Sequence, residues 1–314
     1  MTRLILLGAL SAAFFSSTFI LNRAMSLQGG HWLWSASLRY AYMLVFLVGG
    51  FVLTGKTAVL RQILKVFCRH WFFWVAAGTT GFGLFYSSIC FSAAYAPGWV
   101  VATTWQTTIL ASPLVLLFFG KRVPPKALSF IVIIFVGILM VNLEQAQTAS
   151  IHHLLLGGIP VLLAAAAYPL GNQMVWEAQK GGHKRIPDIH DPVLQNPFAR
   201  ILLLTMGSIP FWIILALLIQ PPAPSTGQWL QTAQVALFSG VIATGLFLQA
   251  RHLASNAYEI SAIDSTQSTE VIFALLGEVL LLGVVMPGFL GWTGILLVVS
   301  GLVCYVKAQY RPAA

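Results

Sequence analysis

Ten apolar stretches, each close to the roughly 20 residues that a helix needs to cross a bilayer, follow one another along this chain of 314 residues. Only 8% of the residues are charged, against roughly 25% in a soluble domain. The first stretch is long for a signal peptide, so we expect it to remain as a helix. The sequence therefore predicts an all-α polytopic membrane protein. Its stretches are 4–22, 33–53, 71–93, 98–119, 127–143, 154–176, 198–219, 229–250, 258–283 and 288–306.

The basic residues predict the orientation of these helices. If the N-terminus is cytoplasmic, fourteen Lys and Arg residues fall in cytoplasmic loops, and only Arg23 falls in an outer loop. This positive-inside asymmetry predicts that both termini are cytoplasmic and that the chain lies in the inner (cytoplasmic) membrane of the cell. The net charge of +9 then faces anionic lipid, so no nucleic-acid partner is expected. The fourteen are Arg3, Lys56, Arg61, Lys65, Arg69, Lys121, Arg122, Lys126, Lys180, Lys184, Arg185, Arg251, Lys307 and Arg311.

Three segments of the first half resemble three segments of the second half, in the same order. "FILNRAM" resembles "YPLGNQM", "SLRYAYMLVFLVGG" resembles "FARILLLTMGSIPF", and "APGWVVATTWQTT" resembles "NAYEISAIDSTQST". The last two pairs share an offset of 161, and the first has an offset of 150. The alternative is a chance match among apolar helices. The aligned polar residues are Asn22 with Asn172, Arg39 with Arg200, and Gln106 with Gln267.

Five helices per half would make the second half enter the membrane from the opposite side. The matches therefore predict a 5+5 inverted repeat of ten transmembrane helices, with a substrate site at the midplane between the halves. The predicted halves are residues 1–143 and 144–314. The cytoplasmic loop 177–197 carries an insertion that accounts for the change of offset, and we expect no chemistry in it.

The chain resembles the drug/metabolite transporter superfamily with its EamA-like repeats. The resemblance rests on the 5+5 arrangement, the Asn22 end of the first helix, Arg39 early in the second, the turn "AYAPG", and Pro113. "STQSTEVIFALLGEVLLLG" and "GFLGWTGILLVVSGLV" are most similar to the branch described as "putative multidrug resistance efflux transporters". In that family, Pro commonly follows the position of Glu270, where this chain has Val271. The resemblance implies a secondary transporter of small molecules.

Three acidic residues lie in the ninth stretch, although the whole chain has only eight. Helical spacing puts Asp264, Gln267, Glu270 and Glu278 on one face. A charge at mid-bilayer costs about 2.5–3.5 kcal/mol, so this face must meet the bundle interior or a water-filled cavity. Glu270 lies nearest the midplane, where a low dielectric favours its neutral form, and we expect it to exchange protons or bind substrate.

The other two acids have cationic candidates as partners. Either Asp264 or Glu259 could form a structural ion pair with Arg251, and Glu278 could pair with Arg39 if their helices are neighbours. For all three acids the alternative to a transport role is a hydrogen-bonded, structural one.

The stretch "TTWQTT" (103–108) is the predicted counterpart of the acidic helix in a substrate pocket. It offers Thr104, Gln106 and the indole of Trp105, which lies too deep for an interfacial belt. An indole face beside a carboxylate suits an aromatic or cationic ligand. The alternative is that Trp105 only fills space and that the threonines bond to their own helix. Weaker pocket candidates are Tyr86, Tyr168, Asn22 and Asn172.

These features favour a secondary active exporter of small, drug-like, aromatic or cationic solutes, coupled to protons by alternating access. One alternative is a metabolite carrier of amino-acid or nucleobase type that works by facilitated exchange, and another is a lipid flippase. An enzyme is not expected, because the chain has no HExxH, no GxSxG and no nucleotide-binding loop. Its three cysteines are scattered, so no metal site or cofactor is expected either. The substrate's identity and the oligomeric state stay open.

Overall fold

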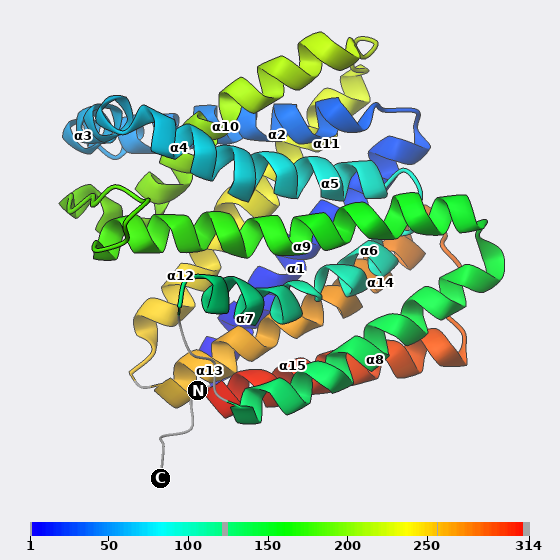
Figure 1. Ribbon diagram of the computed structural model, residues 1–314. Coiled ribbons are helices and arrows are strands. Elements are labelled where there is room, and N and C mark those ends of the chain that lie inside the picture. The colour runs from blue at the N-terminus through cyan, green and yellow to red at the C-terminus, as the bar shows by residue number, and fades with distance from the viewer. Residues whose placement is uncertain (1, 121–124, 256, 310–314) are drawn as a thin grey trace.

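The computed structural model describes residues 2–120, 125–255 and 257–309, and every regular element in these ranges is helical. The helices lie side by side in one bundle (Figure 1). In chain order they are α1 (Thr2–Leu27), α2 (Trp32–Leu53), α3 (Thr57–Arg69), α4 (Trp71–Gly78), η1 (Thr79–Leu84), α5 (Phe85–Ser92), α6 (Gly98–Trp105), α7 (Thr108–Phe118), α8 (Pro125–Thr148), α9 (Ile151–Lys180), η2 (Pro192–Gln195), α10 (Pro197–Ile219), α11 (Thr226–Val235), η3 (Ala236–Ala243), α12 (Thr244–Leu253), α13 (Ala257–Ser265), η4 (Thr266–Thr269), α14 (Glu270–Leu282) and α15 (Phe289–Gln309).

Nine helices in the described ranges are long and apolar enough to cross a membrane. They match nine of the ten expected stretches. The remaining stretch, 71–93, forms the continuous helical run α4–η1–α5, but it is not among the nine. Because Thr79, Thr80, Ser87 and Ser88 lower its hydropathy, its assignment as a tenth span stays a prediction.

Helix α3 was not expected from hydropathy, which indicated only a basic loop between the second and third stretches. The structure shows an amphipathic helix that buries Ile63 and Val66 and exposes Arg61, Lys65 and Arg69. A single apolar stripe of this kind is too narrow to raise the mean hydropathy of the segment. It is the pattern of a helix that lies along a membrane surface.

Two expected spans are interrupted at the same relative position. One span is divided into α6 and α7 at Gln106 and Thr107, and the other contains the 3-10 turn η4, which includes Gln267. Two further helical runs contain π-helical segments, η1 and η3. These two segments also correspond in the predicted repeat, because an offset of 161 places η1 (79–84) at residues 240–245, which overlap η3. Such interruptions often lie at functional sites, because they release main-chain groups and redirect side chains.

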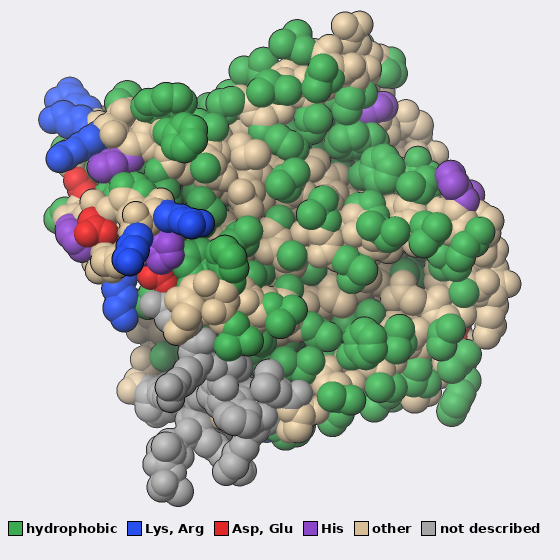
Figure 2. All heavy atoms as spheres, viewed as in Figure 1, with side chains coloured by type: hydrophobic (Ala, Val, Ile, Leu, Met, Phe, Trp, Pro, Cys, Tyr) green, Lys and Arg blue, Asp and Glu red, His purple; other side chains and the backbone are tan. Residues whose placement is uncertain are grey.

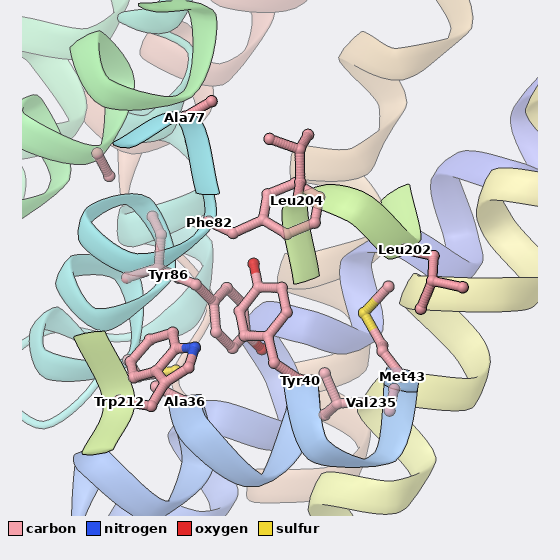
Figure 3. Packing of buried hydrophobic residues seen from close by; sticks show 14 of the residues in the cluster. Ala36, Tyr40, Met43, Ala77, Phe82, Tyr86, Leu202, Leu204, Trp212 and Val235 are labelled. Carbon is pink, nitrogen blue, oxygen red and sulfur yellow. The ribbon is translucent and has the colours of Figure 1, made fainter. Parts of the chain in front are cut away.

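Helices of the two predicted halves pack across each other. Helix α1 packs against α14, η3 and α12, whereas α9 packs against α5, η1 and α7. The most extensive contact joins α8 to α15 (Figure 1). At the centre of the bundle, Tyr40 stacks between Phe82 and Trp212, with ring centroids 5.1 and 5.5 Å away, and Tyr86 meets it edge-on (Figure 3).

Lys and Arg side chains gather at one end of the molecule, over α3 and the loop that follows α9 (Figure 2). The start of α1 and the end of α15 lie at this same end (Figure 1). We call it the basic end. Lys121, Arg122 and Arg311, which the positive-inside count also includes, lie outside the described residues, as does the side chain of Lys126.

Glycine allows the closest helix contacts. A Cβ on Gly207 of α10 would clash with the carbonyl oxygen of Trp74 in α4, and a Cβ on Gly137 of α8 would lie 2.6 Å from the carbonyl oxygen of Gly294 in α15. Apolar side chains gain little by leaving lipid for one another, so membrane helices associate through close contacts of this kind.

Gly207→Ala is therefore expected to lower the free energy of unfolding by about 1–3 kcal/mol, because α4 and α10 must separate to admit the methyl group. Gly50→Ala in α2 is the matched control, since a Cβ there meets nothing within 4 Å. Thermal unfolding in detergent should show a lower midpoint for Gly207→Ala and an unchanged or slightly higher one for Gly50→Ala. Equal midpoints would contradict the close α4–α10 contact.

Candidate functional site

A buried cation lies at the centre of the bundle. Arg39 of α2 is only 8% exposed, and its guanidinium donates to the hydroxyl of Ser239 at 3.0 Å and to that of Thr18 at 3.4 Å. It also lies over the ring of Tyr86, 4.1 Å from the centroid. Asn22 donates to the hydroxyl of Tyr86 at 3.0 Å. The charge of Arg39 is therefore held by hydroxyls and an aromatic face, and the expected pair with Glu278 does not form.

Glu278 has a different partner, which sequence spacing could not indicate. Its carboxylate, with the residue fully buried, accepts hydrogen bonds from the main-chain N–H groups of Gly98 at 2.7 Å and Trp99 at 2.8 Å. These groups begin α6 and lack partners within their own helix. Negative charge is favoured at a helix N-terminus. Glu278 therefore caps α6. This is the hydrogen-bonded, structural role that the sequence left open as the alternative to a role in transport.

Arg23 lies near the same turn. It donates to the carbonyl oxygen of Ala93 at 2.9 Å and acts electrostatically on Glu278. A Cβ on Gly98 would lie 2.8 Å from the carbonyl oxygen of Phe19 and 3.0 Å from Glu278. The glycine in "AYAPG" is thus the one feature of the sequence that could have indicated the contact between Glu278 and α6. Only glycine, which lacks a side chain, lets α1 and the carboxylate approach the main chain at this position so closely.

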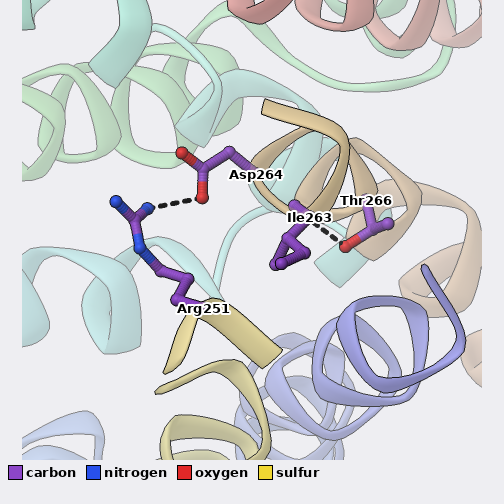
Figure 4. A network of polar contacts seen from close by, with 4 residues as sticks. All are labelled: Arg251, Ile263, Asp264 and Thr266. Atoms are coloured by element: carbon purple, nitrogen blue, oxygen red, sulfur yellow. Dashed lines mark hydrogen bonds and ion pairs between the residues drawn. The ribbon is translucent and has the colours of Figure 1, made fainter. Parts of the chain in front are cut away.

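Asp264 lies in an ion pair at the basic end of the bundle. Its carboxylate is 2.5 Å from the guanidinium of Arg251, one of the pairings considered from the sequence (Figure 4). The two side chains are 18% and 38% exposed, respectively. In the next turn, Thr266 donates to the carbonyl oxygen of Ile263. The geometry thus makes Asp264 a structural partner of Arg251.

A double-mutant cycle should show a weak coupling between these two residues. We expect Arg251→Gln, Asp264→Asn and the double variant to give a coupling free energy of about 0.5–1 kcal/mol, because both side chains are partly exposed and water screens the pair. Thermal or denaturant unfolding of the four proteins measures it. A coupling several times larger would show that the pair is effectively buried in the membrane.

Glu270 differs from the other two acids of this helix. It is partly buried at the start of α14, directly after η4. Within the described part of the chain, its carboxylate makes no hydrogen bond and no ion pair; the groups that act on it electrostatically are Arg39 and Tyr168. Glu270 is thus the acid of this helix whose oxygens are left free for a proton or a ligand.

Helix α6, which packs against α14, brings an aromatic cluster toward the helix that carries this carboxylate. The rings of Phe85, Trp105 and Tyr168 form a cluster from α5, α6 and α9, with centroid separations of 4.9 Å for Phe85–Trp105, 4.9 Å for Phe85–Tyr168 and 5.6 Å for Trp105–Tyr168. Tyr168 is 37% exposed and connects the cluster to open space. Carboxylate and aromatic faces are therefore available on neighbouring elements, as binding of an aromatic cation requires.

A cleft of about 660 Å³ opens beside Tyr168 and extends to the basic end, where α9 ends and α10 begins. It lies between η1, α7, α9, α10 and α12. Of the residues predicted to form a pocket, Tyr168 and Asn172 line it. Thr108, the last residue of the predicted stretch 103–108, lines it as well, whereas the sequence did not indicate Phe82, Gln173 or Trp176 as lining residues. Arg200 also lines the cleft, and its only signal was the alignment with Arg39.

The remaining predicted residues have mainly local partners. Gln106 donates to the carbonyl oxygen of Ala102 at 3.3 Å, and Asn172 donates to that of Tyr168 at 3.0 Å. Thr104 accepts a hydrogen bond from Asn142 of α8 at 3.0 Å. The contacts of Gln106 and Asn172 stay within their own helices, whereas Thr104 bonds to a neighbouring helix and so does not follow the alternative in which the threonines bond to their own helix.

Gln267 is the exception. Its side-chain nitrogen is buried and has no partner in the described ranges. No three His, Cys, Asp or Glu side chains of the described residues are grouped so that they could hold a metal ion.

Comparison with known proteins supports the helical architecture. A solved crystal structure matches the whole chain over its own whole length with a TM-score of 0.60 at 15% sequence identity, which shows a shared fold. The uncharacterized protein YjlA of Bacillus subtilis (strain 168) is 39% identical over 322 residues, covering 97% of this chain and 94% of its own. An uncharacterized 42.1 kDa protein of Shouchella clausii, from the 3' region of an intracellular alkaline protease, is 39% identical over 258 residues; the match covers 78% of this chain and 64% of that protein.

A family model matches almost the entire chain. It is EmrE, described as "Putative multidrug resistance efflux transporter", and the match covers residues 2–311. The family consists of membrane transporters and not of enzymes. Its members lie in a lipid bilayer and bind small-molecule substrates. This multi-pass membrane protein therefore belongs to the EmrE family of the drug/metabolite transporter superfamily.

Proposed function

We propose that this protein exports small aromatic or cationic solutes in exchange for protons, by alternating access across the inner (cytoplasmic) membrane. The observation that carries the proposal is the free carboxylate of Glu270, which acts electrostatically on Tyr168, a residue that lines the open cleft. The carboxylate can neutralise a cationic substrate, and the ring cluster of Phe85, Trp105 and Tyr168 can stack against its aromatic part.

Exchange follows from competition for one carboxylate. A substrate entering through the cleft binds Glu270 in its charged form, and a proton arriving from the opposite side neutralises the same group and releases the substrate. A single carboxylate then couples the substrate flux to the proton flux, because it binds either the substrate or the proton at one time. No residue other than Glu270 needs to change its charge in this cycle.

The conformation described here fits one half of the cycle. The cleft opens at the basic end, which the positive-inside pattern places in the cytoplasm. At the opposite end, Glu278 holds the start of α6 against α14. We infer an inward-open state of ten helices in a 5+5 inverted repeat, with halves 1–143 and 144–314. The paired interruptions at Gln106 and Gln267 support this arrangement, since transporter sites commonly lie at discontinuous helices.

Flux of a fluorescent cation tests the proposal. Purified protein in proteoliposomes should move rhodamine 123 against its concentration gradient when a pH gradient is imposed, and should stop when an ionophore removes that gradient. The other candidate, a metabolite carrier working by facilitated exchange, is favoured by the amides of Asn172 and Gln173 in the cleft. It would instead show flux that is accelerated by unlabelled substrate on the far side and is indifferent to the pH gradient.

A further inference from the structure

Arg200 is the one charged side chain among the described residues that line the cleft. It lies in the first turn of α10, at the basic end, and is partly buried. Phe82, Trp176 and Leu204 line the same cleft, so the guanidinium borders a largely apolar space. A cation at this place is unexpected in a pocket for cationic solutes, because like charges repel.

No Asp or Glu side chain neutralises Arg200. All eight acidic residues of the chain lie in the described ranges, and none forms an ion pair or hydrogen bond with this guanidinium. Apart from Glu270, each has a partner elsewhere. Glu144 caps α15, Glu177 accepts from Gln173, Asp188 from Gly182, Asp191 from Gln62 and Glu259 from Ser255, while Asp264 binds Arg251 and Glu278 caps α6.

The contrast with Arg39 shows that this exposure is particular to Arg200. The two residues occupy the same position in the predicted repeat, at an offset of 161. Arg39 donates to Thr18 and Ser239 and is covered by the ring of Tyr86, so its donors are directed into the protein. Arg200 has none of these contacts, and its donors remain available to a molecule in the cleft. A guanidinium presents a planar fork of N–H groups that matches an oxyanion.

The spacing within the cleft also fits a ligand with two ends. Tyr168 and Trp176 both line it and lie eight residues apart on α9, which corresponds to roughly 12 Å along the helix axis. Because Tyr168 and Arg200 line the same cleft, a molecule of drug size held there can contact both the ring of Tyr168 and the guanidinium of Arg200. Its cationic part would lie at the Tyr168 side, on which Glu270 acts electrostatically, and an anionic part would meet Arg200.

We propose that Arg200 binds an oxyanion of the substrate, so that the preferred solutes are amphoteric aromatic molecules that carry both a cationic nitrogen and a carboxylate. The inference rests on the proposed function, because it extends the same cleft from one charged contact to two. It also gives a physical reason for a free acid and a free base within one bundle. One amphoteric ligand offers a partner to both, whereas a simple cation leaves the guanidinium without one.

A pair of dyes that differ in one group tests this inference. Rhodamine 110 carries a free carboxylate, and rhodamine 123 is its methyl ester. Binding to the purified full-length protein can be measured by fluorescence polarisation. Wild-type protein should bind rhodamine 110 roughly tenfold to a hundredfold more tightly than the ester, the range expected for a hydrogen bond to a charged group.

Variants assign that preference to Arg200. Arg200→Gln should remove it by weakening rhodamine 110 binding alone, and Arg200→Lys should retain part of it. Arg61→Gln is the matched control, because it removes the same charge from the exposed face of α3 at the same end of the molecule. Affinity of Arg200→Gln for rhodamine 123 that equals or exceeds the wild-type affinity shows that the variant is folded.

Two results would overturn the inference while leaving the proposed function intact: equal wild-type affinity for the two dyes, or a preference that survives in Arg200→Gln. Loss of the preference for rhodamine 110 in Arg61→Gln would also overturn the inference. The preference would then arise from the overall positive charge of the basic end and not from a contact with Arg200. If the wild-type protein neither binds nor transports either dye, the proposed function fails together with the inference.

Discussion

Replacing Glu270 with glutamine is expected to abolish proton-driven export while leaving the protein folded. The amide has the same shape as the carboxyl group but can neither take up a proton nor neutralise a cation. Because the native carboxylate makes no hydrogen bond within the described part of the chain, its replacement breaks no structural contact there. Flux of rhodamine 123 driven by an imposed pH gradient should fall at least about tenfold in proteoliposomes, as expected when one essential charge contact worth more than 1.4 kcal/mol is lost.

Asp264→Asn is the matched control for this result. It removes a carboxylate from the same helical run, but one that the structure places in an ion pair with Arg251. Its proton-driven flux should stay within about threefold of wild type, because the pair is partly exposed and weak. Full proton-driven flux in Glu270→Gln would show that the coupling residue lies elsewhere. A large loss in Asp264→Asn alone would move that role to Asp264.

The second large effect concerns stability. Glu278→Ala should lower the free energy of unfolding by about 2–4 kcal/mol, because it leaves two buried main-chain N–H groups without an acceptor. The groups are those of Gly98 and Trp99, at the start of α6. A helix N-terminus in an apolar interior has no water to replace the carboxylate. Thermal unfolding in detergent should show the shift.

Glu144 offers the comparison within the same chain. It caps α15 by accepting from the N–H groups of Gly288 and Gly291, but the first of these contacts is exposed. Glu144→Ala is therefore expected to cost only about 1 kcal/mol, as for a cap that water can replace. A Glu278→Ala protein no less stable than Glu144→Ala would contradict a buried structural role for Glu278.

Much of the fold was predictable because membrane helices are specified locally. Nine of the ten apolar stretches coincide with helices long and apolar enough to cross a membrane, and the tenth forms the helical run α4–η1–α5. The amphipathic α3 and the interruptions at Gln106 and η4 were not predicted. The apolar stretches were located by mean hydropathy. Each of these features changes the direction or the exposed face of a helix and leaves its mean hydropathy unchanged, so hydropathy could not reveal them.

The site was predicted less completely. The sequence pointed to Glu270 because of its helical face and to Tyr168 because of its aromatic ring, and in the structure the two residues interact electrostatically. Thr104 and Gln106 instead have hydrogen-bond partners in or next to their own helix. Arg200, which the sequence indicated only as a repeat partner, lines the cleft.

The stretch from Asp264 to Glu278 shows where sequence reasoning ends. By itself the sequence determined that three acids share one helical face within a bundle of apolar helices, because helix periodicity and hydropathy are properties of adjacent residues. Only the tertiary structure decided which acid is free. Glu278 is capped by N–H groups about 180 positions away in the chain, and Asp264 is paired with Arg251 on a separate helix. Among the described residues, no neighbouring helix brings a hydrogen-bond donor to Glu270, and contacts between distant helices are set by how the whole bundle packs.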